Sequence, residues 1–147
     1  MLIFESNSES LRLYKIKIIM GFLNTLFGSK QEQKSLDWKV LEDVKQLDNA
    51  LAISKEKPVV IFKHSTSCGI SRMVLNQFQN NADFDEDAVL LLYLDLLAHR
   101  DISNAIAEKF GVLHQSPQMI ILHKGQVAYH ASHSAIVPGA VNRILET

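Results

Sequence analysis

The sequence has only one cysteine, Cys68, in 147 residues. A single cysteine cannot form an intramolecular disulfide, which excludes the disulfide-stabilised secreted scaffolds and favours a reducing compartment, so we expect a cytoplasmic protein. The chain also has little excess charge, with 15 Lys+Arg against 16 Asp+Glu. Because no basic block attracts phosphates or anionic lipids, we expect neither nucleic acid nor a membrane as a partner.

Long apolar runs are missing as well. The apolar residues of the first twenty are interrupted by polar residues 5–10 and by Arg12, Lys15 and Lys17, which does not fit a secretory signal. No later run is long enough to cross a bilayer. The composition of the whole chain, with 47% apolar and 21% charged residues, is typical of one soluble domain that buries its own core.

The N-terminal part differs from the rest of the chain. Met20 stands directly before Gly21-Phe22-Leu23, which reads as a natural beginning, so we interpret residues 1–19 as an upstream extension or a mis-assigned start. Residues 29–36 are a polar tract without periodicity, which we interpret as a solvated linker. We therefore expect residues 1–36 to be an extension and linker, and residues 37–147 to form the folded domain.

In the predicted domain, short apolar runs alternate with segments whose apolar residues recur at helical spacing. Continuous apolar runs are typical of buried parallel strands, and Lys124-Gly125 is the turn signal of a β-hairpin. This order predicts an α/β fold with a mixed sheet flanked by helices. The predicted strands are 38–41, 59–62, 89–94, 118–122 and 126–129, and the predicted helices are 44–51, 70–78, 102–110 with Asp101 as N-cap, and 138–145.

Cys68 falls where the strand that begins at Val59 gives way to a helix. Free backbone N–H groups and the helix dipole at such a position stabilise the thiolate over the thiol, which makes the sulfur a better nucleophile. His64 either tunes this thiolate or merely fills a loop, and we interpret Lys63 as a solvated strand end. The alternative for Cys68 itself is a small buried apolar side chain without chemistry.

The segment Cys68-Gly69-Ile70-Ser71 has the spacing of a Cys-x-x-Cys redox motif, but a hydroxyl replaces the second thiol. Such a monothiol site can attack a disulfide and keep half of it as an adduct, which an external thiol must release. Ser71 stands one helical turn after Cys68, where it either donates a hydrogen bond to the thiolate or is simply a polar residue of the first turn.

Pro117 precedes an apolar run whose interior would not accept a proline, so we place it at the entrance of a strand, where a cis peptide bond is an option. An ordinary loop proline is the alternative. The backbone of Ser116 is then available to pair with an extended substrate. The six histidines are scattered and lack a carboxylate at a ligand spacing, so we expect no metal.

Three motifs together resemble one family, the monothiol bacilliredoxins, which are the YtxJ-type proteins of the bacillithiol system within the thioredoxin-like superfamily. They are FKHSTSCGIS at 62–71, ISN at 102–104 followed by FGV at 110–112, and SPQ at 116–118. The resemblance implies a thioredoxin-like fold, Cys68 as the redox-active nucleophile supported by its neighbours Thr66, Gly69 and Ile70, and Pro117 as a cis-proline facing it.

The resemblance also implies an activity, the removal of bacillithiol from S-bacillithiolated cytoplasmic proteins. Its partners are then those client proteins and bacillithiol itself, which serves as a low-molecular-weight co-substrate, and no cofactor is bound. Two alternatives stay open. The Cys-Gly-Ile-Ser segment differs at one position from the Cys-Gly-Phe-Ser motif of monothiol glutaredoxins that carry iron–sulfur clusters, and an inert Cys68 would indicate a non-catalytic thioredoxin-like interaction module.

Overall fold

The computed structural model describes residues 3–26 and 33–147, and the chain divides into two compact units, residues 1–33 and 34–147. The first unit contains one helix, α1 (Ile3–Leu26). Among the described residues no helix combines the length and apolarity that crossing a membrane requires. Residues 29–32 of the predicted linker lie outside the described residues. The second unit holds every motif discussed above, and the rest of the description concerns it.

The second unit is built on one five-stranded mixed sheet with the strand order β1-β3-β2-β4-β5. The first three strands of that order run parallel, β4 is antiparallel to β2, and β5 is antiparallel to β4. This arrangement confirms the predicted α/β fold with a parallel and an antiparallel half. The strands are β1 (Lys39–Val40), β2 (Val59–His64), β3 (Leu90–Asp95), β4 (Gln118–His123) and β5 (Gln126–Ser132).

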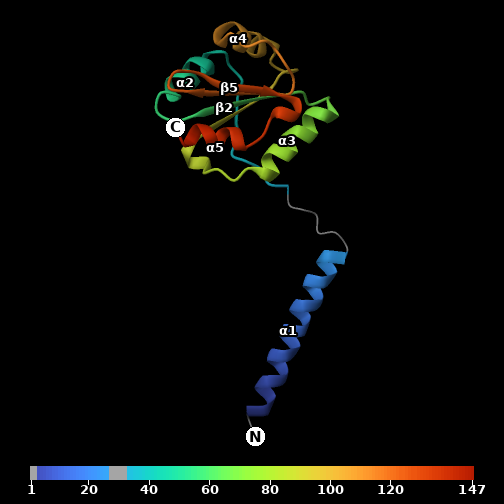
Figure 1. The fold of residues 1–147 in the computed structure, drawn as a ribbon. Helices are drawn as coiled ribbons and strands as arrows, with labels where there is room; N and C mark the ends of the chain where they lie inside the picture. The colour runs from blue at the N-terminus through green and yellow to red at the C-terminus, as the bar shows by residue number, and fades with distance from the viewer. Residues whose placement is uncertain (1–2, 27–32) are drawn as a thin grey trace. The chain divides into compact units, whose positions relative to one another are not determined.

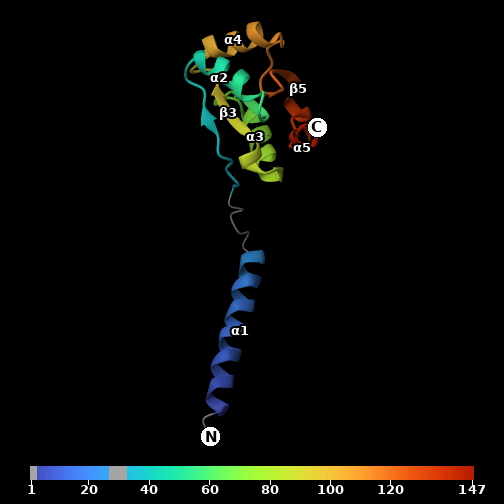
Figure 2. The same cartoon turned by 90° about the vertical axis from the view of Figure 1, so that its left-hand side faces the viewer.

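Four helices cover the two faces of the sheet (Figures 1 and 2). The helices α2 (Lys45–Ile53) and α4 (Arg100–Phe110) lie on one face, and α3 (Gly69–Asn81) and α5 (Gly139–Leu145) lie on the other. Two short 3₁₀ turns, η1 (Glu86–Ala88) and η2 (His133–Ala135), complete the unit. The sheet is therefore the middle of three layers, with a hydrophobic core on each side.

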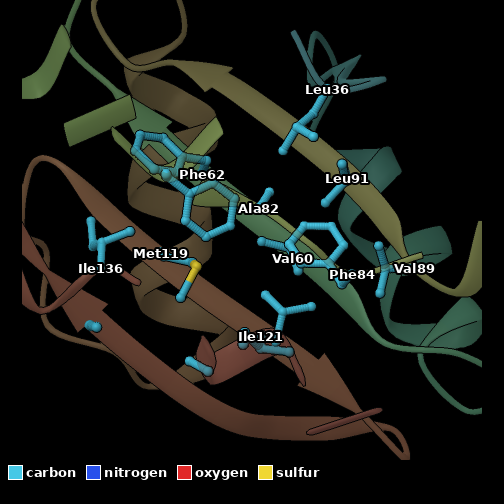
Figure 3. Packing of buried hydrophobic residues seen from close by; sticks show 14 of the residues in the cluster. Leu36, Val60, Phe62, Ala82, Phe84, Val89, Leu91, Met119, Ile121 and Ile136 are labelled. Carbon is cyan, nitrogen blue, oxygen red and sulfur yellow. The ribbon is translucent and has the colours of Figure 1, made fainter. Parts of the chain in front are cut away.

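Strand β2 contributes to both cores because successive side chains of a strand point to opposite faces. Val60 and Phe62 pack in the core under α3 and α5, where Met119 and Ile121 of β4 join them (Figure 3). Val59 and Ile61 belong to the core under α2 and α4. The continuous apolar run that the sequence shows here is thus required by burial on both faces.

An aromatic cluster ties α3 to the sheet and to the start of the unit. The ring of Phe78 lies about 6 Å from the rings of Trp38, Phe62 and Phe84 by centroid distance, at 6.2, 6.0 and 6.1 Å. The indole N–H of Trp38 donates to Oε1 of Gln79 at 2.8 Å, which satisfies the polar end of a partly buried ring. These contacts hold α3, the helix that Cys68 caps, against β2.

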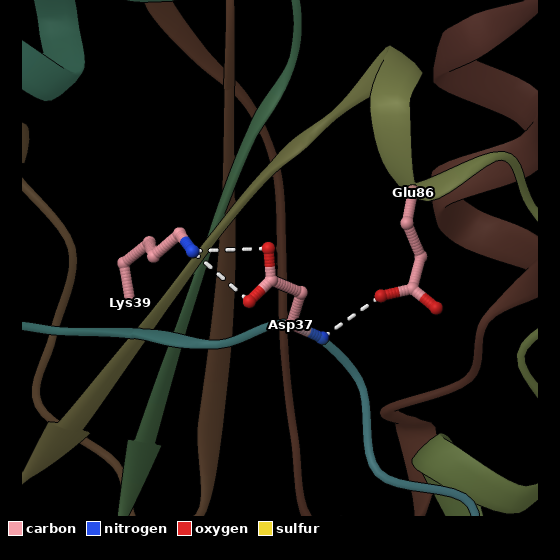
Figure 4. Close-up of polar contacts among 3 residues, drawn as sticks. All are labelled: Asp37, Lys39 and Glu86. Atoms are coloured by element: carbon pink, nitrogen blue, oxygen red, sulfur yellow. Dashed lines mark hydrogen bonds and ion pairs between the residues drawn. The ribbon is translucent and has the colours of Figure 1, made fainter.

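The segment before β1 is part of the folded unit. Leu36 is buried in the core with α3 and α5, so the interpretation of residues 29–36 as a solvated linker is wrong for this residue. The backbone N–H of Asp37 donates to Oε2 of Glu86 at 2.8 Å, and Nζ of Lys39 lies 3.0 Å from both carboxylate oxygens of Asp37 (Figure 4). The Lys39–Asp37 pair is exposed and therefore contributes little stability.

The predicted hairpin turn and the predicted N-cap of α4 have different outcomes. Lys124 and Gly125 both have positive φ, at 55° and 75°, as the predicted tight hairpin turn requires. The prediction of Asp101 as N-cap is wrong, because α4 begins at Arg100 and His99 occupies the capping position. Asp101 lies inside the first turn, where its negative charge still interacts favourably with the helix N-terminus.

The aromatic cluster predicts a large effect for one substitution in α3. Replacing Phe78 with Ala should lower the free energy of unfolding by about 3–5 kcal/mol, because it empties a fully buried site. Urea denaturation followed by the fluorescence of Trp38, the chain's one tryptophan, measures this directly. Met73→Ala on the exposed side of the same helix is the matched control, and an equal loss in both variants would contradict the packing argument.

Candidate functional site

Cys68 occupies the N-cap position of α3, as its place in the sequence predicts. Its backbone N–H donates to the carbonyl of Ser65 at 3.1 Å, and its carbonyl accepts the N–H of Arg72 at 3.1 Å. Cys68 is a partly exposed residue, and in the described part of the chain no group forms a hydrogen bond with its sulfur. The cysteine is therefore partly exposed and lies at the N-terminus of a helix.

Ser71 lies in the first turn of α3 and is fully buried. Its hydroxyl oxygen accepts the backbone N–H of Ser65 at 3.1 Å and lies 2.7 Å from Nδ1 of His64. The hydroxyl is thus engaged with the loop before Cys68 instead of with the thiol. Ser71 shapes the site by joining the end of β2, the loop and the start of α3.

His64 ends β2 and is buried beside this loop, with its ring 5.7 Å from that of Tyr93. Burial lowers the pKa of His64. The negative charge of Asp95 raises this pKa, the positive charge of Arg72 lowers it, and a hydrogen bond with Ser71 raises it. The neutral imidazole is therefore favoured, and its contact is with Ser71. Burial likewise raises the pKa of the neighbouring Tyr93 hydroxyl, with Asp95 adding to the effect.

Arg72 is a member of the site that the sequence analysis missed. Nη2 of its guanidinium donates to the carbonyl of Thr66 at 3.3 Å, so its positive charge lies across the loop that carries Cys68. The sequence feature that could have identified it is its position four residues after the cysteine, which places it one helical turn further along α3. The other predicted neighbours of Cys68 are exposed: Thr66 lies in the loop, and Gly69 and Ile70 begin α3.

Lys63 is the clearest departure from expectation. The interpretation as a solvated strand end is wrong, because β2 is central in the sheet and the side chain is completely buried. Nζ lies 2.7 Å from Nδ1 of His114 and donates to Oε1 of Gln118 at 3.2 Å. Burial lowers the pKa of Lys63 to about 8, and these two partners compensate part of the cost of burying the amine.

The segment before β4 carries Ser116 and Pro117, whose peptide bond is cis. Pro117 is buried, and its carbonyl accepts the N–H of His133 at 3.1 Å. Since Gln118 pairs with Lys63 in the β2–β4 register, Pro117 lies at the same end of the sheet as the loop of Cys68. The sheet thus brings the two predicted parts of the site to one edge.

Two further side chains stand out at this edge. Oγ of Ser116 is buried and has no hydrogen-bond partner in the described part of the chain. Gln118 supports the segment, since Nε2 donates to the carbonyl of Leu113 at 2.9 Å. Within residues 3–26 and 33–147, no three His, Cys, Asp or Glu side chains are grouped as metal ligands.

The contacts of Ser71 predict a structural cost for its removal. Ser71→Ala leaves the buried His64 nitrogen and the Ser65 N–H without their partner, so the free energy of unfolding should fall by about 1–3 kcal/mol. Exchange with a chromogenic disulfide should slow in this variant and disappear in Cys68→Ala. Ser67→Ala, an exposed serine of the same loop, should change stability by less than about 0.5 kcal/mol, and a larger loss there would contradict this assignment.

The buried Lys63 predicts a pH dependence of stability. Its amine keeps a proton up to about pH 10.5 when unfolded but only to about pH 8 when folded. Between these values the unfolded state binds more protons, so the contribution of Lys63 to the free energy of unfolding becomes more favourable as pH rises. The free energy of unfolding of wild type, relative to that of Lys63→Met, should therefore rise by about 3 kcal/mol at most between pH 8 and 10.5.

Denaturation series at several pH values measure this difference. Lys45→Met, which removes an exposed lysine from the first turn of α2, provides the control, and its difference from wild type should be flat over the same range. A flat difference for Lys63→Met as well would mean that the amine is not held in the buried position described.

Solved structures of other proteins share the fold. A candidate oxidoreductase with a thioredoxin fold is 29% identical, with a TM-score of 0.60 over 74% of this chain and 92% of that one. Thioredoxins of Malassezia sympodialis and Trypanosoma brucei brucei are 20% and 21% identical. Their TM-scores are 0.56 and 0.54, over 77% and 80% of this chain and 91% and 93% of theirs. The fold is thus thioredoxin-like, as the resemblance implied.

The family comparison covers the site as well as the fold. The matching family is described as monothiol bacilliredoxin BrxC, and the match extends over residues 39–141. This span includes β2, the loop of Cys68, the first turn of α3 and the segment of Ser116 and Pro117. This match, together with the single cysteine that lies within it, indicates that the protein has a redox role. With most of its length matched, the chain belongs to the monothiol bacilliredoxin family.

Proposed function

We propose that this protein is a cytoplasmic monothiol thiol–disulfide oxidoreductase that removes bacillithiol from S-bacillithiolated proteins through a mixed disulfide on Cys68. One observation carries the proposal: the chain's single cysteine is a partly exposed thiol at a helix N-terminus, in a member of the bacilliredoxin family. An interaction module without chemistry would be expected to have an inert, buried Cys68, and the exposure of the thiol weighs against it.

The reaction is a pair of thiol–disulfide exchanges. The thiolate of Cys68 attacks the bacillithiol sulfur of the client's mixed disulfide, a new S–S bond forms, and the client leaves as a thiolate that takes up a proton. A second low-molecular-weight thiol then attacks the bacillithiol sulfur on Cys68. Bacillithiol leaves in a disulfide with that thiol, which supplies the two electrons, and Cys68 returns to its reduced state.

The residues of the site have separate tasks in this scheme. The N-terminal N–H groups of α3 stabilise the thiolate both as attacking and as leaving group. Arg72 adds a positive charge beside the loop, which favours an anionic reactant near Cys68. The backbone before Pro117 is placed to pair with the extended client segment, and Ser71 and His64 keep the loop in shape.

Intact-protein mass spectrometry tests the proposal. After brief exposure to bacillithiol disulfide, wild type should gain one bacillithiol adduct, and a parallel exposure to glutathione disulfide should give a slower adduct. Cys68→Ala should gain neither. When a bacillithiolated protein replaces the small disulfide, the same adduct should form on Cys68, and the client should be released in its reduced form.

Absence of any adduct on wild type would contradict the proposal. A coloured protein after anaerobic reconstitution with iron and sulfide would instead support the iron–sulfur alternative, whose chemistry also uses a cysteine thiolate.

A further inference from the structure

A small cleft lies on the α4 side of the sheet, at the edge that holds the site. Its volume is about 180 Å³, and it is lined by Leu96, Arg100, Ser103, Asn104 and His114. Apart from Leu96 every lining side chain is polar and can donate a hydrogen bond, and none of them is a carboxylate. The cleft is therefore suited to an acceptor that carries negative charge.

Lys63 determines which hydrogen-bonding group His114 presents. The ammonium of Lys63 can only donate, so Nδ1 of His114, 2.7 Å away, must accept. The ring proton of neutral His114 is then on Nε2, which makes that nitrogen a donor. Because Gln118 also holds Lys63, the orientation of the ring is supported from a buried strand and not only from the surface segment that carries it.

The two charges that act on His114 have the same sign. The pKa of His114 is lowered first by burial, then by the positive charges of Lys63 and Arg100. These two cations come from different elements, β2 and α4, and both act on the same ring. Two unneutralised positive charges beside a concave set of donors are the arrangement by which proteins recognise carboxylates.

The cleft borders both segments that flank Cys68. The backbone N–H of Leu96 donates to the carbonyl of His64 at 3.0 Å, so one wall adjoins the strand end that leads into the active-site loop. His114 stands two residues before Ser116, in the segment that leads to Pro117. The cleft therefore lies at the carboxyl ends of β2 and β3, the end of the sheet from which the loop of Cys68 begins.

We propose that this cleft binds a carboxylate of the low-molecular-weight thiol that exchanges with Cys68, with Arg100 and His114 as the binding residues and Lys63 as the residue that positions His114. The proposal rests on the proposed function, because it assigns a place to part of that substrate. Bacillithiol carries its carboxylates on a malyl group, remote from the sulfur, and glutathione also carries carboxylates. The recognised chemistry is the carboxylate, and the source is decided by experiment.

The test compares disulfides with and without carboxylates. Rates of adduct formation on Cys68 are measured with bacillithiol disulfide, glutathione disulfide and bis(2-hydroxyethyl) disulfide, which has none. Arg100→Gln and His114→Gln should each slow the reaction with bacillithiol disulfide about tenfold and leave the reaction with the hydroxyethyl compound unchanged. Arg143→Gln, an exposed arginine of α5 on the opposite side of the sheet, is the matched control.

The outcomes separate the possibilities. A loss with bacillithiol disulfide alone identifies the malyl group as the ligand, and an equal loss with glutathione disulfide identifies carboxylates in general; both support the cleft. Unchanged rates, or the same loss with the hydroxyethyl compound, would overturn it, because the residues would then be idle or merely structural.

A second measurement does not depend on exchange. Malate is titrated into the full protein while the resonances of the Arg100 and His114 side chains are followed by NMR. Saturable shifts in wild type that Arg100→Gln abolishes support the cleft even if no adduct forms on Cys68, in which case only the proposed function fails. If adducts form but malate causes no saturable shift and the rates are unchanged, the cleft proposal fails alone.

Discussion

The burial of β2 on both faces and both edges is the constraint on which the site depends. All six of its side chains are buried, and it pairs with β3 on one side and β4 on the other. A strand held in this way cannot shift its register without moving apolar residues out of both cores. Its carboxyl end is therefore a rigid base, and the loop to Cys68 begins from a fixed point.

The same strand end produces two polar clusters on opposite faces. His64 points to the α3 side and joins Ser71, whereas Lys63 points to the other side and joins His114 and Gln118. The first cluster holds the loop of Cys68, and the second supports the segment before Pro117. Neighbouring residues of one strand thus support both the loop of Cys68 and the segment before Pro117, and the partners of Lys63 compensate part of the cost of burying its amine.

Much of this was accessible from the order of residues. The strand–helix alternation, the hairpin at Lys124-Gly125 and the position of Cys68 at a helix start all follow from local patterns, because periodicity, turn chemistry and helix ends are short-range effects. The exceptions have physical reasons as well. Leu36 is a single apolar residue in a polar tract, and only the core under α3 explains its burial.

The sequence by itself determined the α/β class, the single cysteine and its place at the start of α3, because each depends on residues close together in the chain. Only the tertiary structure decided that Lys63 is buried and bonded to His114, and that Ser71 serves His64 and Ser65 instead of the thiol. Those contacts join residues on different elements, up to 51 positions apart. The Lys63–His114 contact depends on β2 and β4 becoming neighbours in the sheet, and the Ser71 contacts depend on how α3 packs against the end of β2; no local pattern encodes either.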